Sequence, residues 1–211
     1  SGCGKTTVLK ILAGLHSHEE GSVRIGSEAD KFDPARDIGM VFQQPLLLKW
    51  RNVLDNVLLP AEILGLNMAE ARDRAGHLLD MVGLSGFAES YPYELSGGMQ
   101  QRAAIARALV HDPKLILMDE PFGALDALTR EKMNLELLRI WGESGKTIVF
   151  VTHGIQEAVF LGSRVVVLTA GPARMADNFL VEVPYPRTLD MKTQETFGDY
   201  TRRIYKLLGM E

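Results

Sequence analysis

The chain has 211 residues, 46% of them hydrophobic, and its 23 lysines and arginines against 27 aspartates and glutamates give a formal net charge of -4. This length and apolar content are enough for one globular domain with its own core, which excludes an intrinsically disordered chain. The acidic balance argues against a broad nucleic-acid-binding surface and against direct anchoring on anionic lipid. No apolar run reaches the roughly 18 residues of a spanning helix, so a role at a membrane would require a partner.

At the start of the chain, small and glycine-rich residues lead into the apolar pattern of a helix. Glycines let backbone N–H groups converge on an anion, and a helix N-terminus adds partial positive charge. Lys5 would then reach the terminal phosphates of a nucleotide, and the Thr6 hydroxyl would ligate Mg²⁺. We therefore predict a nucleoside triphosphate site formed by Ser1, Gly2, Cys3, Gly4, Lys5, Thr6 and Thr7.

The complete phosphate-loop pattern, G-x-x-x-x-G-K-[ST], needs its first glycine two positions before Ser1. The chain also lacks an initiator methionine, so we expect it to be a fragment without its N-terminal segment and the strand that leads into the loop. A chance Gly-Lys-Thr in a turn is the alternative for this stretch alone. A second Gly-Lys-Thr, at residues 145–147, has Ile140 at the first-glycine position and precedes a strand pattern, so we interpret it as a helix-to-strand turn.

Two short apolar runs, residues 22–25 and 38–42, are predicted to be strands, after a first helix that ends near Gly14. The histidines and glutamates of residues 16–20 could be mistaken for a metal cluster. No distant ligand has a matching spacing, so we interpret them as a solvated loop.

An apolar cluster at residues 46–50 occupies a position where a loop would normally be polar. Such a patch usually marks an interface. Helical spacing then covers residues 53–64 and 67–82, with an asparagine available to cap each helix. These helices are predicted to form a lobe outside the parallel sheet.

A second glycine-containing helix start has the sequence Leu-Ser-Gly-Gly-Met-Gln-Gln-Arg at residues 95–102. Ser96 followed by Gly97 and Gly98 would bind an anion by the same physics as the first loop. Two such helix starts with a single lysine-bearing loop indicate two half-sites. A capped helix with a Gly-Gly hinge is the alternative for Ser-Gly-Gly alone, and the full eight-residue run argues against it.

Two carboxylates end an apolar run that begins at Leu115, which is the pattern of a central parallel strand. Ligands of α/β sheets bind at the carboxyl ends of the strands. We therefore predict that Asp119 holds Mg²⁺ and that Glu120 polarises a water molecule. His153 follows the next predicted strand and would reach the same edge, although a lone histidine is more often a packed core residue.

The rest of the chain adds supporting elements. Residues 123–126 are expected to turn into a helix that reaches about Trp141. Residues 164–168 and 176–183 are predicted to form a strand and an edge hairpin, and residues 193–208 an amphipathic helix that docks onto the domain.

Together these motifs resemble the nucleotide-binding subunit of an ATP-binding cassette (ABC) transporter over the whole chain. The matches are the end of the Walker A loop (Ser1 to Thr6), the Q-loop (Gln43), the signature motif (Leu95 to Gln100), Walker B (Leu115 to Glu120), the D-loop (Ala124 to Asp126) and the switch histidine (His153). The resemblance implies an α/β P-loop NTPase with a central, mostly parallel sheet. It also implies a single ABC ATPase domain over residues 1–211 without its N-terminal strands, a helical subdomain at about 46–110 and a C-terminal helix at about 193–208.

The resemblance also implies the roles of individual residues around ATP and Mg²⁺. Catalytic roles would fall to Glu120, His153 and Gln43. Metal ligation would fall to Thr6, Gln43 and Asp119. Besides the first seven residues, the predicted nucleotide contacts are Ser96, Gly97, Gly98, Gln100 and Asp126.

Finer features are similar to the nitrate, sulfonate and taurine importers of this family. The matching runs are Val41-Phe42-Gln43-Gln44-Pro45, the Leu-Leu-x-x-Trp-Arg run through Trp50, Asp55-Asn56-Val57, Tyr91-Pro92-Tyr93-Glu94 and Leu128-Thr129-Arg130-Glu131-Lys132-Met133. One departure is Gly154, because this subfamily usually has an acidic residue after the switch histidine.

The implied assembly is a head-to-tail homodimer that binds integral-membrane permease subunits at the cytoplasmic face of the inner membrane. An external solute-binding protein would act indirectly, and no nucleic acid would be bound. Two alternatives are a soluble ABC ATPase that acts on nucleic acid or ribosomes and a cassette that binds ATP without turnover. The sequence shows neither a second cassette nor a basic face, and the carboxylate pair argues for turnover.

Overall fold

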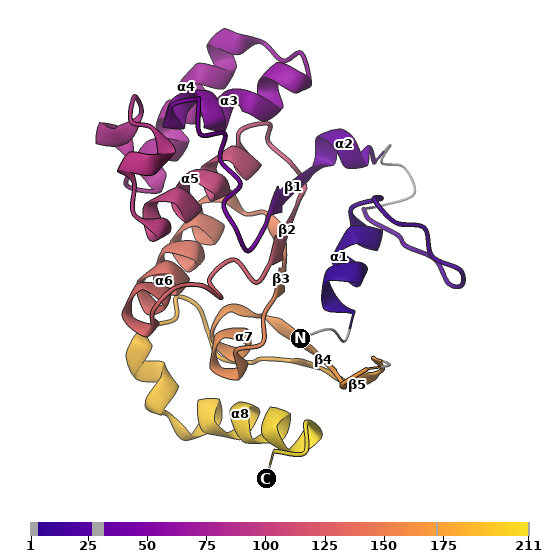
Figure 1. Ribbon diagram of the computed structural model, residues 1–211. Helices are drawn as coiled ribbons and strands as arrows, with labels where there is room; N and C mark the ends of the chain where they lie inside the picture. The colour runs from indigo at the N-terminus through magenta and orange to yellow at the C-terminus, as the bar shows by residue number, and fades with distance from the viewer. Residues whose placement is uncertain (1–3, 27–31, 172, 211) are drawn as a thin grey trace.

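The computed structural model describes residues 4–26, 32–171 and 173–210, and its centre is a parallel sheet (Figure 1). In that sheet β1 (Ile38–Val41), β2 (Leu115–Asp119) and β3 (Thr147–Val151) lie in the order β1-β2-β3. Ile38 pairs with Leu115, and Leu115 pairs with Thr147. The strands therefore end side by side, and the predicted α/β architecture with a parallel sheet is confirmed.

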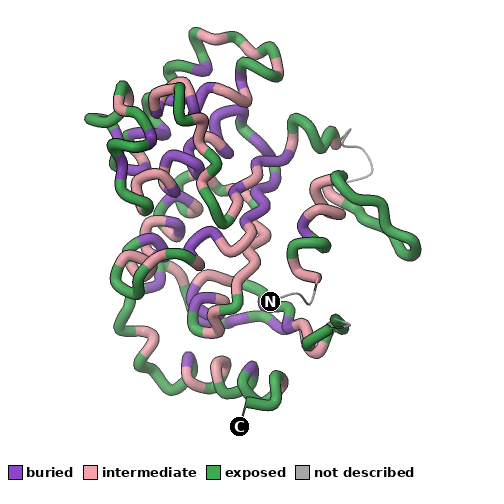
Figure 2. The backbone as a smooth tube through the Cα atoms, viewed as in Figure 1, coloured by how far each residue is buried: buried purple, intermediate pink, exposed green. Residues whose placement is uncertain are grey.

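Both faces of the sheet are covered, as the continuous apolar sequence of β2 predicts. Successive side chains of a strand point to opposite faces. Leu115 and Leu117 accordingly pack with Leu9 of α1 (Lys5–Leu12), whereas Ile116 and Met118 join the larger core under the helices of the other face. Figure 2 shows the buried residues concentrated along the strands and the inward faces of these helices.

A helical lobe packs beside the sheet through α3 (Val53–Ile63), α4 (Met68–Met81) and α5 (Gly97–Leu109), with short 3-10 turns η1 (Ser85–Phe87) and η2 (Pro92–Glu94) between them. Asn52 caps α3 by accepting a hydrogen bond from the Asp55 N–H at 2.7 Å, and Asn67 caps α4. Because α5 packs against both the lobe helices and β1, it joins the lobe to the sheet.

Besides β3, the described part of the chain after β2 forms three helices, a pair of strands and a short 3-10 helix. These are α6 (Ala127–Ser144), α7 (Ile155–Leu161), the antiparallel pair β4 (Arg164–Leu168) and β5 (Met175–Leu180), η3 (Leu189–Thr193) and α8 (Glu195–Leu207). Phe197 and Ile204 of α8 are buried in the core that these elements share with Phe160. The C-terminal amphipathic helix therefore docks onto the domain, as predicted.

Two expectations about local structure have opposite outcomes. The strand predicted at residues 22–25 is wrong, because this segment pairs with no strand in the described ranges and its residues are mostly exposed. Apolar composition does not make a strand without a hydrogen-bonding neighbour. The second Gly-Lys-Thr is a turn, as expected: Gly145 closes α6 with φ 62° and Thr147 begins β3. The short helix α2 (Pro34–Asp37), capped by Asp33, has no counterpart in the sequence-based expectations.

Candidate nucleotide-binding site

Five of the predicted site residues meet at the carboxyl edge of the parallel sheet. Asp119 ends β2, Glu120 and His153 follow β2 and β3, and α1 begins beside them with Lys5 and Thr6. The Thr6 hydroxyl donates a hydrogen bond to Asp119 Oδ1 at 3.2 Å, and Lys5 Nζ lies 3.9 Å from Glu120 Oε1. His153 Nδ1 lies 3.0 Å from Glu120 Oε2. Residues distant in sequence are thus brought within contact of one another.

Glu120 lies in a tight turn directly after β2. Its φ of 44° lies in the left-handed region, which non-glycine residues adopt at a cost of about 1–3 kcal/mol. Its N–H donates to the Val151 carbonyl at 2.9 Å, and its own carbonyl accepts from the Gly123 N–H at 3.0 Å. These two hydrogen bonds hold the turn, so the carboxylate stays between Lys5 and His153.

The start of α1 has a backbone conformation suited to anion binding. Gly4 precedes the helix with φ 106°, a conformation that favours glycine, and no side chain within the described residues caps this helix start. Backbone N–H groups at a helix start, with a lysine in the first turn, are suited to phosphate oxygens. Ser1, Gly2 and Cys3 of the predicted loop lie outside the described residues.

Gln43 comes to the same edge from β1. A Cβ atom built on Gly123 would lie 3.2 Å from Gln43 Nε2, so the glutamine amide packs closely against the turn that carries Glu120. The predicted Mg²⁺ ligands, Thr6, Asp119 and Gln43, all supply neutral or anionic oxygen, which suits this hard cation. Because Thr6 and Asp119 are in direct contact, their oxygens lie close enough together for both to ligate one ion.

The second predicted helix start lies elsewhere. Figure 1 shows α1 and α5 on opposite sides of the sheet. Ser96 caps α5 by accepting a hydrogen bond from the Met99 N–H at 3.3 Å, and a Cβ built on Gly97 would meet nothing within 4 Å. Gln100 Nε2 donates to the carbonyls of Pro92 and Leu95, so its amide nitrogen holds the preceding loop. One chain therefore does not bring its two helix starts together.

Asp126 serves the start of α6. Its carboxylate accepts a hydrogen bond from the Thr129 N–H at 3.0 Å, and hydrogen bonds from Thr129 lower the pKa of this exposed carboxyl. Its position after the Gly123 turn leaves it on the surface, away from the contacts of Lys5, Thr6 and Asp119 described above.

Sequence reasoning missed two residues that shape the apolar loop at 46–50. The buried Asn56 accepts from the Leu48 N–H at 2.7 Å and donates to the carbonyls of Leu48, Arg51 and Asn52. Arg107 donates to the carbonyls of Pro45 and Leu46. The signal for Asn56 was a polar residue at a buried position of an apolar helix. These bonds present Trp50 to solvent, where 74% of it is exposed.

Comparison with known proteins gives a consistent picture. Residues 1–123 match the family model described as ABC transporter. A taurine import ATP-binding protein, TauB from Ruegeria pomeroyi, is 47% identical over 213 residues, covering all of this chain and 78% of that protein. The chain belongs to the ABC transporter family. Within this family, the aliphatic sulfonates import ATP-binding protein SsuB of Bacillus cereus is 43% identical, and the match covers 97% of this chain and 78% of SsuB.

The solved structures agree with this family assignment. One is described as the dimeric post-hydrolysis state of the ATP-binding cassette MJ0796 bound to ADP and Pi. It is 37% identical, covers 87% of this chain and 83% of that chain, and has a TM-score of 0.70. The ABC chain therefore has the fold of an ATP-binding cassette. None of the helices in the described ranges has the length and apolar character needed to cross a membrane.

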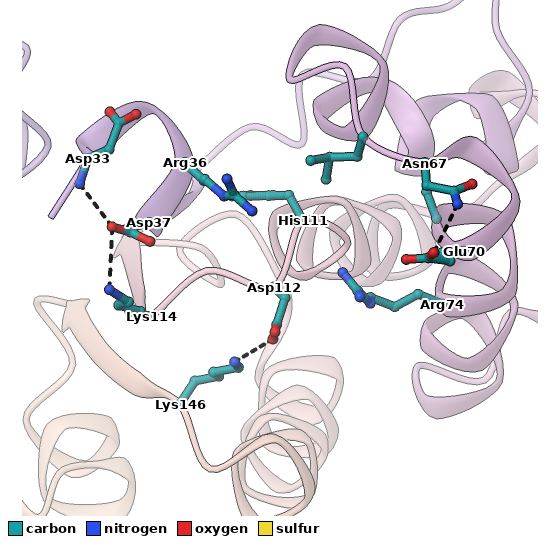
Figure 3. A pocket seen from close by; sticks show the side chains of 12 residues that line it. Asp33, Arg36, Asp37, Asn67, Glu70, Arg74, His111, Asp112, Lys114 and Lys146 are labelled. Carbon is teal, nitrogen blue, oxygen red and sulfur yellow. Dashed lines mark hydrogen bonds and ion pairs between the residues drawn. The ribbon is translucent and has the colours of Figure 1, made fainter. Parts of the chain in front are cut away.

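A polar cavity of about 700 Å³ lies at the opposite edge of the sheet (Figure 3). Three of its residues, Asp37, Lys114 and Lys146, immediately precede β1, β2 and β3. Lys146 pairs with Asp112 at 2.5 Å, and Lys114 lies 3.7 Å from Asp37. These ion pairs join the segments that lead into the strands. The cavity is thus separate from the nucleotide edge, and four of its charged residues form ion pairs with one another.

Proposed function

We propose that this protein is the ATP-hydrolysing subunit of an ABC importer and that it drives uptake of a small sulfonate such as taurine. The observation that carries the proposal is the meeting of Lys5, Thr6, Asp119, Glu120 and His153 at one sheet edge. The solute class is supported by the names of the relatives TauB and SsuB.

The residues at this edge divide the work of phosphoryl transfer. Lys5 and the N–H groups of α1 hold the phosphates of ATP. Thr6, Asp119 and Gln43 would hold Mg²⁺, and the ion would supply positive charge to the phosphate oxygens. Glu120 orients a water for in-line attack and accepts its proton as the bond to ADP breaks. His153 contacts Glu120 and would stabilise the γ-phosphate side of the site.

The functional unit we propose is a head-to-tail homodimer. Each ATP would lie between Lys5 of one chain and the Ser96-Gly97-Gly98 start of α5 in the other, with Gln100 and Asp126 near this second half. The separation of the two helix starts within one chain supports this arrangement. The dimeric cassette structure with a TM-score of 0.70 supports it as well.

The membrane partner would bind the loop at residues 46–50. Leu46 and Trp50 are exposed apolar residues of this loop, which follows Gln43 in the chain, and Asn56 and Arg107 hold the loop backbone. Structural changes caused by ATP binding and hydrolysis would then be transmitted to a bound permease segment through Gln43. The subunit would then sit peripherally at the cytoplasmic face of the inner membrane, while a solute-binding protein acts from the other side.

Reconstitution tests this function. The full-length subunit and its permease, placed in liposomes with the cognate solute-binding protein, should hydrolyse ATP faster when taurine or another alkyl sulfonate is supplied. Radiolabelled solute should accumulate only with ATP. Hydrolysis stimulated by RNA or ribosomes, without solute uptake, would instead support a soluble ATPase.

A further inference from the structure

The residues on either side of His153 are linked by a hydrogen-bond relay. The Gly154 N–H donates to Thr152 Oγ1 at 2.8 Å, and the Thr152 hydroxyl donates in turn to Glu157 Oε2. Glu157 is the third residue of α7, and only 9% of it is exposed. The relay therefore ties the backbone before and after His153 to a buried side chain of the following helix.

This relay takes the place of an ordinary helix cap. In a capping box, the third helical residue bonds directly to the N–H of the cap residue. Here the cap residue is Gly154, which has no side chain to accept a bond, and the threonine hydroxyl is inserted between Gly154 and Glu157. The inserted hydroxyl belongs to the residue just before His153, so helix capping and histidine placement use the same bonds.

Space explains why glycine stands at position 154. Its φ of -83° is ordinary for any residue, so backbone strain does not require glycine. A Cβ atom there would lie 3.3 Å from Thr152 Oγ1 and 3.3 Å from Glu157 Cβ, which is tighter than most real contacts. An acidic side chain would also bring a second carboxylate toward Glu157. Gly154 thus leaves room for the relay, which accounts for the departure seen in the sequence.

Only one oxygen of Glu157 is fixed by the relay. Its other oxygen, Oε1, and Asn134 Oδ1 are buried without a partner in the described part of the chain. Burial raises the pKa of Glu157, opposed by its hydrogen bonds to Thr152 and Asn134 and by the charge of Arg130. The bond to Thr152 fixes the position of Oε2.

We propose that Thr152 and Glu157 are positioning residues that hold His153 against Glu120 through the N–H of Gly154. This inference rests on the proposed function, because it assumes that His153 takes part in ATP hydrolysis. The distance of 3.0 Å between His153 Nδ1 and Glu120 Oε2 is the geometry that the relay would maintain. Without the hydroxyl, the Gly154 N–H would lose its hydrogen bond, and the loop that carries His153 would lose its side-chain tie to Glu157.

The first test replaces Thr152 in the full-length subunit. Thr152→Val keeps the shape of the side chain and removes the hydroxyl, so kcat for ATP should fall about tenfold while KM for ATP is unchanged, in line with the loss of one buried hydrogen bond. Thr152→Ser should restore kcat to within about twofold of wild type, because it retains the hydroxyl. Thr169→Val is the matched control: it removes a threonine hydroxyl that accepts from the Arg174 N–H in the distant β4–β5 hairpin, and kcat should not change.

The second test asks whether Thr152 acts through His153. In a His153→Ala background, Thr152→Val should change the remaining rate by less than about twofold, since contacting residues are non-additive. An equal loss in both backgrounds would overturn the relay and leave the proposed function standing. If His153→Ala alone retained wild-type kcat, both the role of His153 and the relay would be wrong. Melting temperatures of all variants separate these outcomes from misfolding, and a Thr152→Ser enzyme as slow as Thr152→Val would also overturn the proposal.

Discussion

The two helix starts that the sequence marks for anion binding differ in their surroundings. The start of α1 lies among charged groups, with Lys5 near Glu120 and Thr6 bonded to Asp119. The start of α5 offers a hydroxyl and backbone N–H groups, and its first turn, Gly97 to Gln100, contains no charged residue. In the proposed mechanism, the first start carries the groups that would move a proton and hold a metal, while the second would bind and orient charge. The proposed site uses both starts, and one chain keeps them apart.

Glu120→Gln should have the largest effect, a loss of ATP hydrolysis at the site that begins with α1. The amide retains the shape of the carboxyl group but cannot accept the proton of the attacking water, so turnover should fall by roughly 10² to 10⁴. ATP and Mg²⁺ should still bind, and an ATP-stabilised dimer should accumulate. Steady-state hydrolysis and size-exclusion chromatography with ATP would measure both effects. Turnover within a few-fold of wild type would remove Glu120 from its role.

Trp50→Ala should separate transport from hydrolysis, because Trp50 lies on the outer surface and makes none of the contacts at either helix start. We expect uptake in liposomes to fall by about tenfold, the scale of one interface residue that contributes over 1 kcal/mol. Hydrolysis by the isolated subunit should fall far less. Ile63→Ala is the control, since Ile63 is equally exposed at the end of α3, outside the 46–50 loop. Equal losses of uptake in the two variants would contradict a permease contact at Trp50.

Glu157→Gln should make the folded protein more stable at neutral pH, with a smaller effect than the two changes above. Burial raises the pKa of Glu157, so between its unfolded and folded pKa values the folded state holds a proton that the unfolded state has released. The free energy of unfolding therefore falls as pH rises through that window. Above the folded pKa, the full cost of burying the ionised carboxylate lowers stability. The glutamine removes this cost and can donate to Asn134 Oδ1 while still accepting from Thr152.

The expected gain is about 1 kcal/mol, or 2–4 °C in Tm at pH 7.5, and it should shrink as the pH approaches about 4.3. Thermal melting from pH 5 to 8 measures it. Glu182→Gln, at an exposed position on the segment after β5, serves as the control and should change stability by less than about 0.5 kcal/mol. The account would be contradicted if the gain in Tm of Glu157→Gln over wild type were smaller at pH 7.5 than at pH 5.

Local patterns predicted the elements that position the α1 half. The apolar run before Asp119 identified β2, and the carboxyl-edge rule for parallel sheets correctly placed Glu120 and His153 together. The capped helices α3, α4 and α5 were also readable, because caps are formed within a few residues. Each of these features depends on neighbours in sequence or on one general rule of topology.

What escaped prediction depends on distant partners. The segment at residues 22–25 has the composition of a strand, but pairing is non-local and the described chain gives it no partner. Arg107 reaches carbonyls more than 60 residues away at Pro45 and Leu46. The relay from Glu157 to Thr152 needed side-chain directions that periodicity does not supply. The meaning of Gly154 depended on the same contacts.

The claim that the two helix starts meet across a dimer is tested most directly with two inactive chains. Lys5→Ala alone and Ser96→Arg alone should each abolish ATP occlusion in a homodimer, because both sites lose one half. In a mixed dimer the two lesions fall in one site, and the other site joins an intact Lys5 to an intact Ser96. A co-expressed, doubly tagged heterodimer should therefore trap one ATP per dimer, measured as radiolabelled nucleotide that survives rapid gel filtration. A heterodimer that traps no more ATP than either parent would contradict the shared site.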